Sequence, residues 1–296
     1  MNLSQDEFQI LSKYIGQTIG THLGEDKDYL VRQRLAPVVT ALGLSGFGDL
    51  CTVLSSSPSV QVRDAVISAI TTQETSFFRD GHPFEALRTT LLPWLGQIAG
   101  ARRAAEPRRV GPYVSILSAG ASTGQEAYSI AMTAVDHCLA SGGTGLRPDD
   151  LRVTAIDVSS SALERGHSGV YTAAEVARGV TPAQRNAHFR ASGSHYAVRD
   201  DLRRMVEFRR VNLIERDWSL GLFDMVWCRN VLIYFDIDTR RRVMRQLCDA
   251  VVPGGYLVVG ATENVYGLIE GPVSVHMGGS IVYRVGERPE ADGGVR

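Results

Sequence analysis

Small and polar residues follow two apolar runs of the sequence that have the composition of buried β-strands. The first run leads into GASTGQE, from Gly120 to Glu126, and the second ends at Asp157. Small residues let a ligand approach the backbone just before a helix begins. A carboxylate at the next strand end is where nucleotide-binding sheets hold ribose hydroxyls. The pattern indicates a nucleotide-like ligand. An ordinary strand-to-helix turn and a helix-capping role for Asp157 are the alternatives.

Two later strand ends carry further side chains that suit such a ligand. Asn212 can donate and accept hydrogen bonds, and Leu213 offers an apolar surface for an adenine ring, although a turn-forming Asn is the alternative. Arg229 and Asn230 come directly after the apolar run that ends at Cys228. No neighbouring Pro or Ser supports a nucleophilic Cys228, so we interpret it as a buried strand thiol.

The run from Gly120 also fits G-x-S-x-G, the nucleophile elbow of serine hydrolases, with Ser122 as the nucleophile. Asp224 or Asp238, followed by His276, would supply the acid and the base in the order that a hydrolase requires. The elbow normally follows several strands, whereas the sequence before it is helical and contains no HGGG-type segment. A hydrolase is therefore kept only as an alternative.

The first seventy residues must form helices, because their apolar positions recur at helical spacing. Phe8, Leu11, Ile15 and Ile19 make one such face, and Gly20 would end that helix. Its predicted start is a capping box formed by Ser4 and Glu7. Further helices are expected over 29–42, 48–54 and 60–70, which together form a small helical domain.

From residue 113 onward, short β-branched runs alternate with helical ones, which is typical of a parallel sheet covered by helices. A helix over 83–95 and a solvated, arginine-rich loop over 101–112 precede this part. An antiparallel hairpin is expected at the sheet edge, from 273–277 and 281–285. The strand candidates are 113–118, 152–157, 205–211, 223–228 and 256–260.

The segment TTQETSFFRD, residues 71–80, combines polar and aromatic residues at the junction between the helical part and the sheet. Junctions between domains often line binding sites. The simpler interpretation is that Phe77 and Phe78 pin the two domains together while Arg79 is solvated.

Composition excludes several classes of protein. Lys plus Arg number 31 and Asp plus Glu 32, so the overall charge favours neither nucleic acid nor a membrane surface as a partner. The four cysteines form no CxxC pair, and we expect buried thiols in a reducing cytoplasm and no metal. The N-terminus lacks the pattern of a signal peptide, and no apolar run approaches a membrane span. We expect a cytoplasmic monomer that does not insert into a membrane.

Five segments, in this order, closely resemble the CheR family of chemotaxis receptor (protein-glutamate) O-methyltransferases. They are TTQETSFFRD, SAGASTGQEAYSI, AIDVSSSALERG, VNL and CRNVLIYFD. The resemblance implies an all-α N-terminal domain joined to a Rossmann-like class I S-adenosylmethionine (SAM)-dependent methyltransferase domain. That domain has a mostly parallel seven-stranded sheet with an antiparallel strand, and a small antiparallel β-subdomain as an insertion. The expected parts are a helical domain at 1–75, a linker helix and loop at 76–112, the methyltransferase domain at 113–286 with its insertion at about 170–206, and a disordered tail at 287–296.

The resemblance also implies an activity: transfer of a methyl group from SAM to glutamate side chains on the cytoplasmic helices of chemotaxis-type receptors, leaving S-adenosylhomocysteine (SAH). Such a glutamate has a pKa near about 4.3, is ionised at neutral pH and needs no general base. Arg79 and Tyr234 are the candidates for orienting the acceptor. The residues that match cofactor positions of the family are Gln73, Thr75, Arg79, Gly120, Glu126, Asp157, Asn212, Leu213, Arg229 and Asn230, with Tyr234 also near the cofactor.

Three departures from the family pattern qualify these expectations. Gln73 stands where the family usually has an Asn near the methionine end of the cofactor. Arg32 and Arg34 are what remains of a helix that is much more basic in well-known members, so an acidic receptor helix would be gripped less strongly. Residues 193–201 form a shorter insertion than in members that dock a pentapeptide at the receptor C-terminus, which predicts no dependence on that tether. A noncatalytic receptor-binding module on the same fold is a further alternative.

Overall fold

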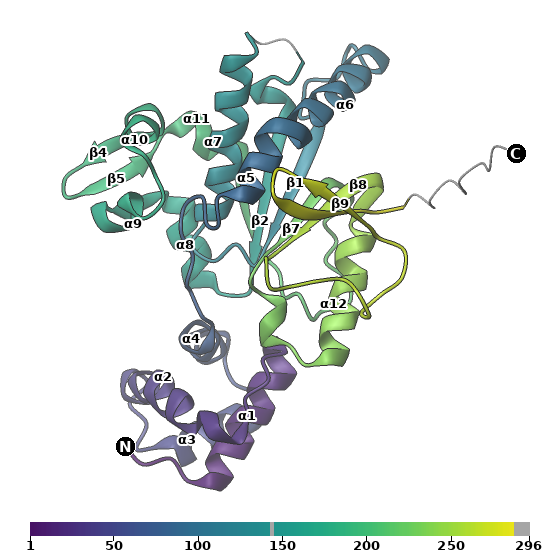
Figure 1. The fold of residues 1–296 in the computed structure, drawn as a ribbon. Helices are drawn as coiled ribbons and strands as arrows, with labels where there is room; N and C mark the ends of the chain where they lie inside the picture. The colour runs from purple at the N-terminus through teal and green to yellow at the C-terminus, as the bar shows by residue number, and fades with distance from the viewer. Residues whose placement is uncertain (143–144, 287–296) are drawn as a thin grey trace, which may run out of the picture.

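The structure is a computed structural model that describes residues 1–142 and 145–286, apart from the side chain of Glu25. Figure 1 shows a helical N-terminal lobe, a large sheet flanked by helices, and a small sheet beside them. The tail that the sequence predicts at 287–296 lies outside the described residues.

Helical spacing of apolar residues correctly predicts the N-terminal lobe. Phe8, Leu11, Ile15 and Ile19 are all buried in one apolar cluster. The capping box is present, because the Ser4 side chain accepts from the Glu7 N–H while the Ser4 N–H donates to the Glu7 carboxylate. The helices of the lobe are α1 (Gln5–Ile19), the short 3₁₀ turn η1 (Glu25–Lys27), α2 (Asp28–Ala41), α3 (Phe47–Ser55) and α4 (Val60–Ile70).

The large sheet has seven strands in the order β6-β2-β1-β7-β8-β10-β9, and β10 runs antiparallel to both of its neighbours. The predicted hairpin at its edge is confirmed as β9 and β10. Strand β8 begins five residues before the predicted Tyr256, with a register irregularity against β7. The strands are β1 (Val114–Ala119), β2 (Leu151–Asp157), β6 (Val206–Arg210), β7 (Phe223–Cys228), β8 (Val251–Val259), β9 (Val273–Met277) and β10 (Ser280–Arg284).

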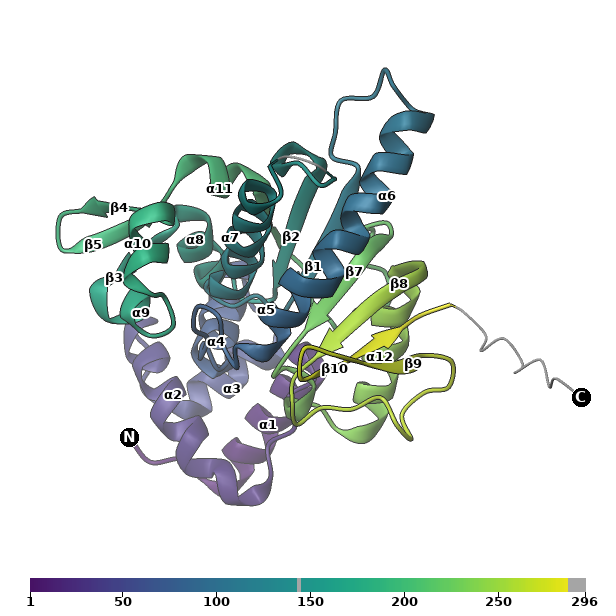
Figure 2. The same ribbon diagram turned by 45° about the horizontal axis from the view of Figure 1, so that its top comes forward.

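Helices cover both faces of this sheet. Alternate residues of a strand point to opposite faces, so Ile116 of β1 joins the core beneath α6 (Leu92–Ala105) and α7, whereas Leu117 joins the core beneath α12. Figure 2 shows α6 and α7 lying side by side across the sheet. The flanking helices and short turns are α7 (Gln125–Ala140), η3 (Pro148–Asp150), α8 (Ser160–Ser168), η4 (Leu232–Tyr234) and α12 (Ile237–Asp249).

A second, three-stranded antiparallel sheet of order β3-β5-β4 lies between α8 and β6 in the chain, where the insertion was expected. Phe77 packs into this part, with ring centroids 5.0 Å from Tyr171 and 5.4 Å from Phe189. The interpretation that Phe77 and Phe78 pin the two domains together is therefore wrong, because Phe77 belongs to the core of the sheet and its insertion and Phe78 packs against that same core. The elements are β3 (Val170–Thr172), α9 (Ala173–Ala177), α10 (Pro182–His188), β4 (Phe189–Ser192), β5 (His195–Val198) and α11 (Asp200–Met205).

The segment before β1 differs from its prediction. Helix α5 (His82–Ala86) continues through a π-helical turn η2 (Leu87–Leu91) into α6 (Leu92–Ala105), so the first part of the predicted loop is helical. Arg102 pairs with buried Asp224 at 2.7 Å, and Arg103 pairs with buried Asp150. Both carboxylates lie at the amino ends of strands of the large sheet. The two ion pairs stabilise the end of α6, which the sequence predicts to be a solvated loop.

The described residues contain no helix long and apolar enough to cross a membrane. Within them, no three His, Cys, Asp or Glu side chains gather as a metal site. Cys51, Cys138 and Cys228 are buried thiols as expected, and Cys248 is half-buried.

Candidate functional site

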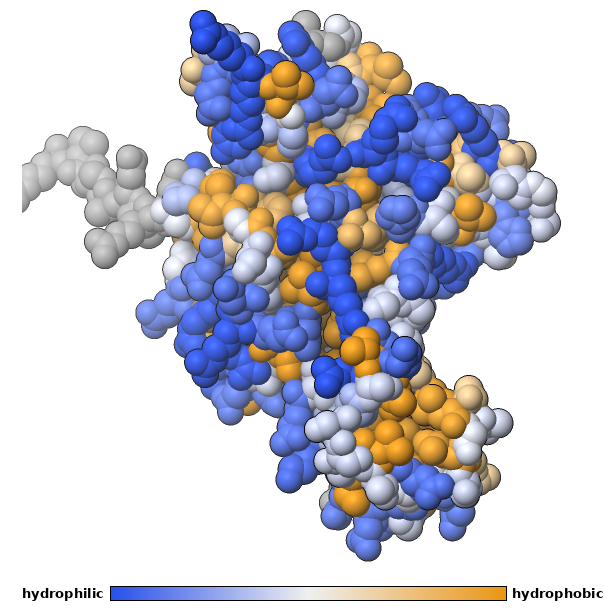
Figure 3. Space-filling view, turned by 180° about the vertical axis from the view of Figure 1, so that it is seen from behind, coloured by the Kyte–Doolittle hydropathy of each residue, from blue (hydrophilic) through white to orange (hydrophobic). Residues whose placement is uncertain are grey.

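A pocket of about 220 Å³ lies where the N-terminal lobe meets the carboxyl ends of β1, β2, β6 and β7. A single water needs only about 10–15 Å³ of such space, so the pocket has room for an organic ligand. Figure 3 shows an indentation between the helical lobe, at the lower right, and the body of the molecule above it. The residues expected to bind the cofactor or orient the acceptor all line this pocket: Gln73, Thr75, Arg79, Gly120, Glu126, Asp157, Asn212, Leu213, Arg229, Asn230 and Tyr234.

The turn after β1 brings the backbone itself to the pocket. Gly120 has a φ of +73°, and a Cβ there would run into the side chain of Val231. The N–H groups of Gly120 and Ala121 both donate to the Ile156 carbonyl at the end of β2. Glycine is therefore required both for the left-handed conformation and for the close approach.

Asp157 is the carboxylate at the end of β2, as predicted. Its Oδ2 accepts the Ser122 N–H at 2.8 Å, and its Oδ1 accepts the Ser159 N–H at 2.9 Å. Burial raises the pKa of Asp157, and these backbone hydrogen bonds only partly offset that rise. The result is a half-buried acceptor fixed to the turn after β1, and Ser159, not Asp157, caps α8.

Arg229, directly after β7, has a side chain that is only 2% exposed and lies between two carboxylates. Its guanidinium is 3.0 Å from Glu126, on α7, and 2.8 Å from Asp80 in the junction segment. Glu126 also accepts from the hydroxyl of Ser118 at 2.8 Å. The Glu126 carboxylate is thus already compensated, and Arg229 ties the junction segment to the floor of the pocket.

The junction segment forms one wall. Gln73 bridges two hydroxyls, because its Nε2 donates to Thr71 at 2.9 Å and its Oε1 accepts from Ser122 at 3.1 Å. Arg79 is half-buried at the wall and donates to the Glu74 carbonyl at 3.0 Å, so it is not simply solvated. Gln73 therefore links the junction segment to the turn after β1, through its hydrogen bond from the Ser122 hydroxyl.

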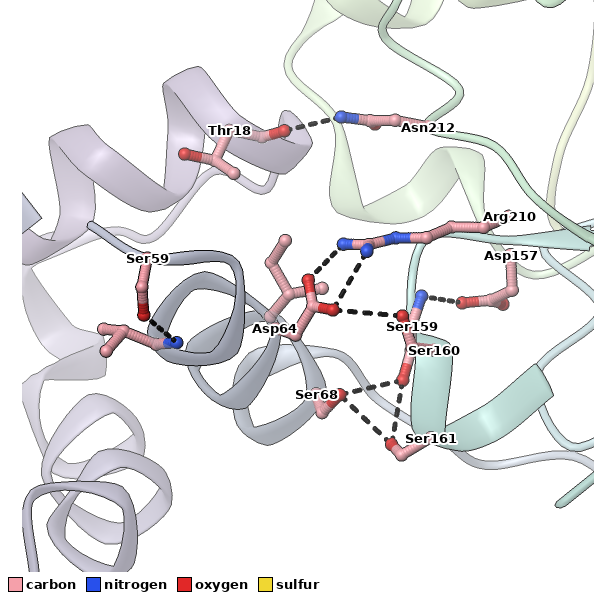
Figure 4. Close-up of polar contacts among 12 residues, drawn as sticks. Thr18, Ser59, Asp64, Ser68, Asp157, Ser159, Ser160, Ser161, Arg210 and Asn212 are labelled. Atoms are coloured by element: carbon pink, nitrogen blue, oxygen red, sulfur yellow. Dashed lines mark hydrogen bonds and ion pairs between the residues drawn. The ribbon is translucent and has the colours of Figure 1, made fainter. Parts of the chain in front are cut away.

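Contacts between the N-terminal lobe and the sheet close the pocket (Figure 4). Asp64 of α4 pairs with Arg210 at the end of β6, and the Asn212 side chain donates to the Thr18 carbonyl at 2.7 Å. The hydroxyls of Ser68 on α4 and Ser159 lie 3.2 Å apart. The lobe is thus attached beside both Asp157 and the Asn212–Leu213 segment.

Several pocket residues come from the N-terminal lobe and carried no recognisable signal in the sequence. His22, Leu23 and Lys27 line the pocket from the connection between α1 and α2. Arg34, by contrast, is singled out in the sequence by its charge; it donates to the Ile70 carbonyl and lines the pocket, whereas Arg32 is exposed. Apolar periodicity predicts helices but does not show which loop between them meets a distant sheet.

The residues of the hydrolase alternative are not brought together. Ser122 donates to Gln73, whereas Asp224 binds Arg102 and the Ser115 N–H at the opposite end of the sheet. His276 lies on β9, the outermost strand. Burial raises the pKa of Cys228 well above its ordinary value, which agrees with an inert strand thiol.

The geometry fits a nucleoside-containing cofactor. A half-buried carboxylate with a raised pKa at the end of β2 faces a glycine turn with no room for a side chain, and the apolar Leu213 follows the neighbouring strand β6. Together with a seven-stranded sheet in which only β10 is antiparallel, this arrangement defines a class I SAM-dependent methyltransferase.

Comparisons with known proteins identify the family. The model of the SAM-binding domain of CheR methyltransferases matches residues 73–272, and the model of their all-alpha domain matches residues 6–71. The chain is 36% identical over 286 residues to a chemotaxis protein methyltransferase of Vibrio parahaemolyticus, covering 96% of this chain and 98% of that protein. It is 34% identical over 285 residues to chemotaxis protein methyltransferase 1 of Pseudomonas aeruginosa, covering 96% and 99%. The chain belongs to the CheR methyltransferase family.

Proposed function

We propose that this protein transfers a methyl group from SAM to glutamate side chains of chemotaxis-type receptors, giving glutamate methyl esters and SAH. The observation that carries the proposal is the single pocket that gathers the junction segment, the strand ends and part of the N-terminal lobe. The names of the relatives, chemotaxis protein methyltransferases, support the same activity.

The cofactor half of the pocket is assigned to the strand ends. Asp157 would accept the ribose hydroxyls, and Asn212 and Leu213 would flank the adenine. Arg229 and Glu126 would fix the floor beneath the methionine part through their buried ion pair. When bound, SAM supplies an electrophilic methyl group on a sulfonium.

The acceptor half is assigned to the junction segment and to the segment after β7. Arg79 and Tyr234 lie on the pocket wall, and Tyr234 is 37% exposed, so an incoming side chain can reach it. An ionised glutamate brings its own nucleophile, so the protein must hold it in line and exclude water. Lys27 and Arg34 add positive charge at the side of the N-terminal lobe.

Receptor recognition is proposed not to need a C-terminal pentapeptide tether. The edge strands of the small sheet, β3 and β4, are only three and four residues long, so an added peptide strand would gain few backbone hydrogen bonds. Methylation of a receptor fragment should proceed at the same rate when its last five residues are deleted. A large loss of rate on deletion would refute tether independence without affecting the proposed chemistry.

The direct test is methyl transfer from radiolabelled SAM to purified cytoplasmic fragments of the chemoreceptors encoded in the same genome. The proposal predicts label in a fragment, its release as methanol by base, and its loss when the mapped glutamate is replaced by Gln. A protein that binds SAH but labels none of these fragments would favour the noncatalytic binding module. We propose that the protein acts as a monomer in the cytoplasm, where the receptor helices present these glutamates.

A further inference from the structure

Glu263 lies outside the pocket but uses its whole carboxylate on the backbone of a pocket wall. Its Oε1 accepts the N–H groups of Val231 at 3.0 Å and Leu232 at 2.7 Å. Its Oε2 accepts the N–H groups of Asn230 at 2.8 Å and Gly260 at 2.9 Å. The residue is 9% exposed and comes from the turn after β8, about thirty residues further along the chain.

The three consecutive N–H groups of residues 230–232 converge on one point because the chain turns sharply there. Asn230 adopts a φ of +59°, which is uncommon for a residue with a side chain. Successive N–H groups in such a conformation form a concave anion site, or nest. Here the protein fills its own nest with the Glu263 carboxylate, which compensates the strained turn.

The carbonyl side of the same segment is held by a positive charge. Arg240 of α12 donates from Nε to the Leu232 carbonyl at 3.0 Å and from a terminal nitrogen to the Phe235 carbonyl at 3.1 Å. The His22 N–H of the N-terminal lobe donates to the Tyr234 carbonyl at 3.0 Å. Residues 230–235 are thus clamped on one side by a carboxylate and on the other by a guanidinium.

Gly260 packs closely against the Glu263 carboxylate and the backbone of Asn230. A Cβ at Gly260 would lie 2.7 Å from the Glu263 Oε2 and 3.0 Å from the Asn230 nitrogen. The first distance is shorter than real Cβ contacts and the second is tighter than most of them, so there is no room for a side chain between the turn after β8 and the segment. The turn after β8 therefore packs closely against both the Glu263 carboxylate and the backbone of Asn230.

We propose that Glu263 is a positioning residue for methyl transfer: it sets the segment 230–235 so that Asn230 and Tyr234 face the pocket in a productive orientation. The inference rests on the proposed function, in which Tyr234 orients the acceptor. Glu263 does not line the pocket itself and acts only through this segment. Asp157, Asn212 and Leu213 stand on other strand ends, and of the expected cofactor residues only Asn230 and Tyr234 lie in the segment, so SAH affinity should depend on Glu263 less than methyl transfer does.

The test is Glu263→Gln, which puts an amide NH₂ against two backbone N–H groups and leaves one acceptor oxygen. We expect kcat on the receptor fragment that the wild type methylates to fall about tenfold or more, since misplacement of reacting groups by about 1 Å costs that much. Affinity for SAH should fall by a clearly smaller factor than kcat, because only Asn230 and Tyr234 of the expected cofactor residues lie in this segment. Amide hydrogen exchange should accelerate at residues 230–232 and stay slow in β1 and β2.

The matched control is Asp150→Asn, another buried carboxylate that accepts a backbone N–H and an arginine, but at the amino end of β2. It should lose stability and keep the kcat of the folded protein. Restoring the carboxylate by Glu263→Asp should recover part of the lost kcat. The proposal is overturned if folded Glu263→Gln keeps the wild-type kcat, or if its kcat and SAH affinity fall by the same factor.

A second variant keeps the inference testable if Glu263→Gln does not fold. Arg240→Gln releases the carbonyl side of the same segment from a half-buried helix position, and it should lower kcat more than SAH affinity. Unchanged kcat in folded Arg240→Gln would overturn the clamp. A wild type that methylates no receptor fragment would instead sink the proposed function, while the exchange of residues 230–232 would still report on the clamp.

Discussion

The Arg229 guanidinium lies 3.0 Å from the Glu126 carboxylate, and the two side chains are only 2% and 13% exposed. The sequence places Glu126 among the residues expected to bind the cofactor. The structure shows that its charge is balanced within the protein, and that Arg229 shares its own charge with Asp80 of the junction segment. This pair therefore holds the floor of the pocket before any ligand binds.

Replacing Arg229 by Met should destabilise the protein strongly. The change leaves Glu126 and Asp80 without their shared cation, and breaking a buried pair from one side costs about 3–5 kcal/mol. Urea unfolding measures the loss. Arg241→Met is the control, because Arg241 is exposed and pairs with Asp238 at only 3.5 Å; it should cost about 0.5 kcal/mol or less. Similar losses in the two variants would contradict the role given to Arg229.

Gly120→Ala should abolish SAH binding and lower stability. The alanine would have to adopt a positive φ, and its Cβ would also collide with the Val231 side chain. Gly43→Ala is a matched control, since Gly43 has a φ of +68° with nothing within 4 Å of its Cβ. The control should carry only the backbone cost, roughly 1 kcal/mol, and bind SAH normally. Calorimetry with SAH and thermal melting of both variants separate the cost of the positive φ from the effect of the collision with Val231. Normal SAH binding by Gly120→Ala would count against the site.

Affinity for SAH should weaken in acid sooner than an ordinary aspartate would predict. Burial raises the pKa of Asp157, and protonation removes the charge that would accept the ribose hydroxyls. Affinity should therefore fall as the pH drops through this raised pKa, above the value of about 3.9 of a free aspartate. Asp157→Asn should bind weakly and lose this pH dependence. A variant that titrates like the wild type would show that another group is responsible.

Asp64→Asn should loosen the N-terminal lobe without unfolding the sheet. It removes the charge that Arg210 and the Ser160 hydroxyl share. Because the pair is partly exposed, the global loss should be about 1 kcal/mol or less. Hydrogen exchange should nevertheless rise in the junction residues 71–76. Asp201→Asn, which breaks a pair with Arg199 inside the small sheet region, should leave that segment unchanged. Equal exchange of residues 71–76 in both variants would argue against Asp64 as the attachment.

Local patterns were sufficient for most of the fold. Helical spacing predicts α1 to α4, and β-branched runs predict the strands that lead into the site. One exception is the end of α6, where the sequence predicts that Arg102 and Arg103 are solvated. Their partners, Asp224 and Asp150, are 122 and 47 positions away in the chain, so no window around the arginines contains the reason for the helix.

The candidate site was predictable where strand ends converge, because parallel strands bring their carboxyl ends to one edge. Asp157, Asn212 and Arg229 are such residues, and one pocket holds them all. His22 and Lys27 were not predictable, because they depend on how the N-terminal lobe rests against that edge. Glu263 was missed for a similar reason: its function lies in backbone contacts, which leave no pattern of side chains.

The central claim is that the pocket between the helical lobe and the strand ends is the SAM site. Calorimetric titration with SAH, for the wild type and for Asp157→Ala, tests it most directly. The account predicts micromolar binding by the wild type, on the order of −8 kcal/mol, and loss of that binding in a folded Asp157→Ala. Absence of binding in the wild type, or full affinity in the variant, would contradict it.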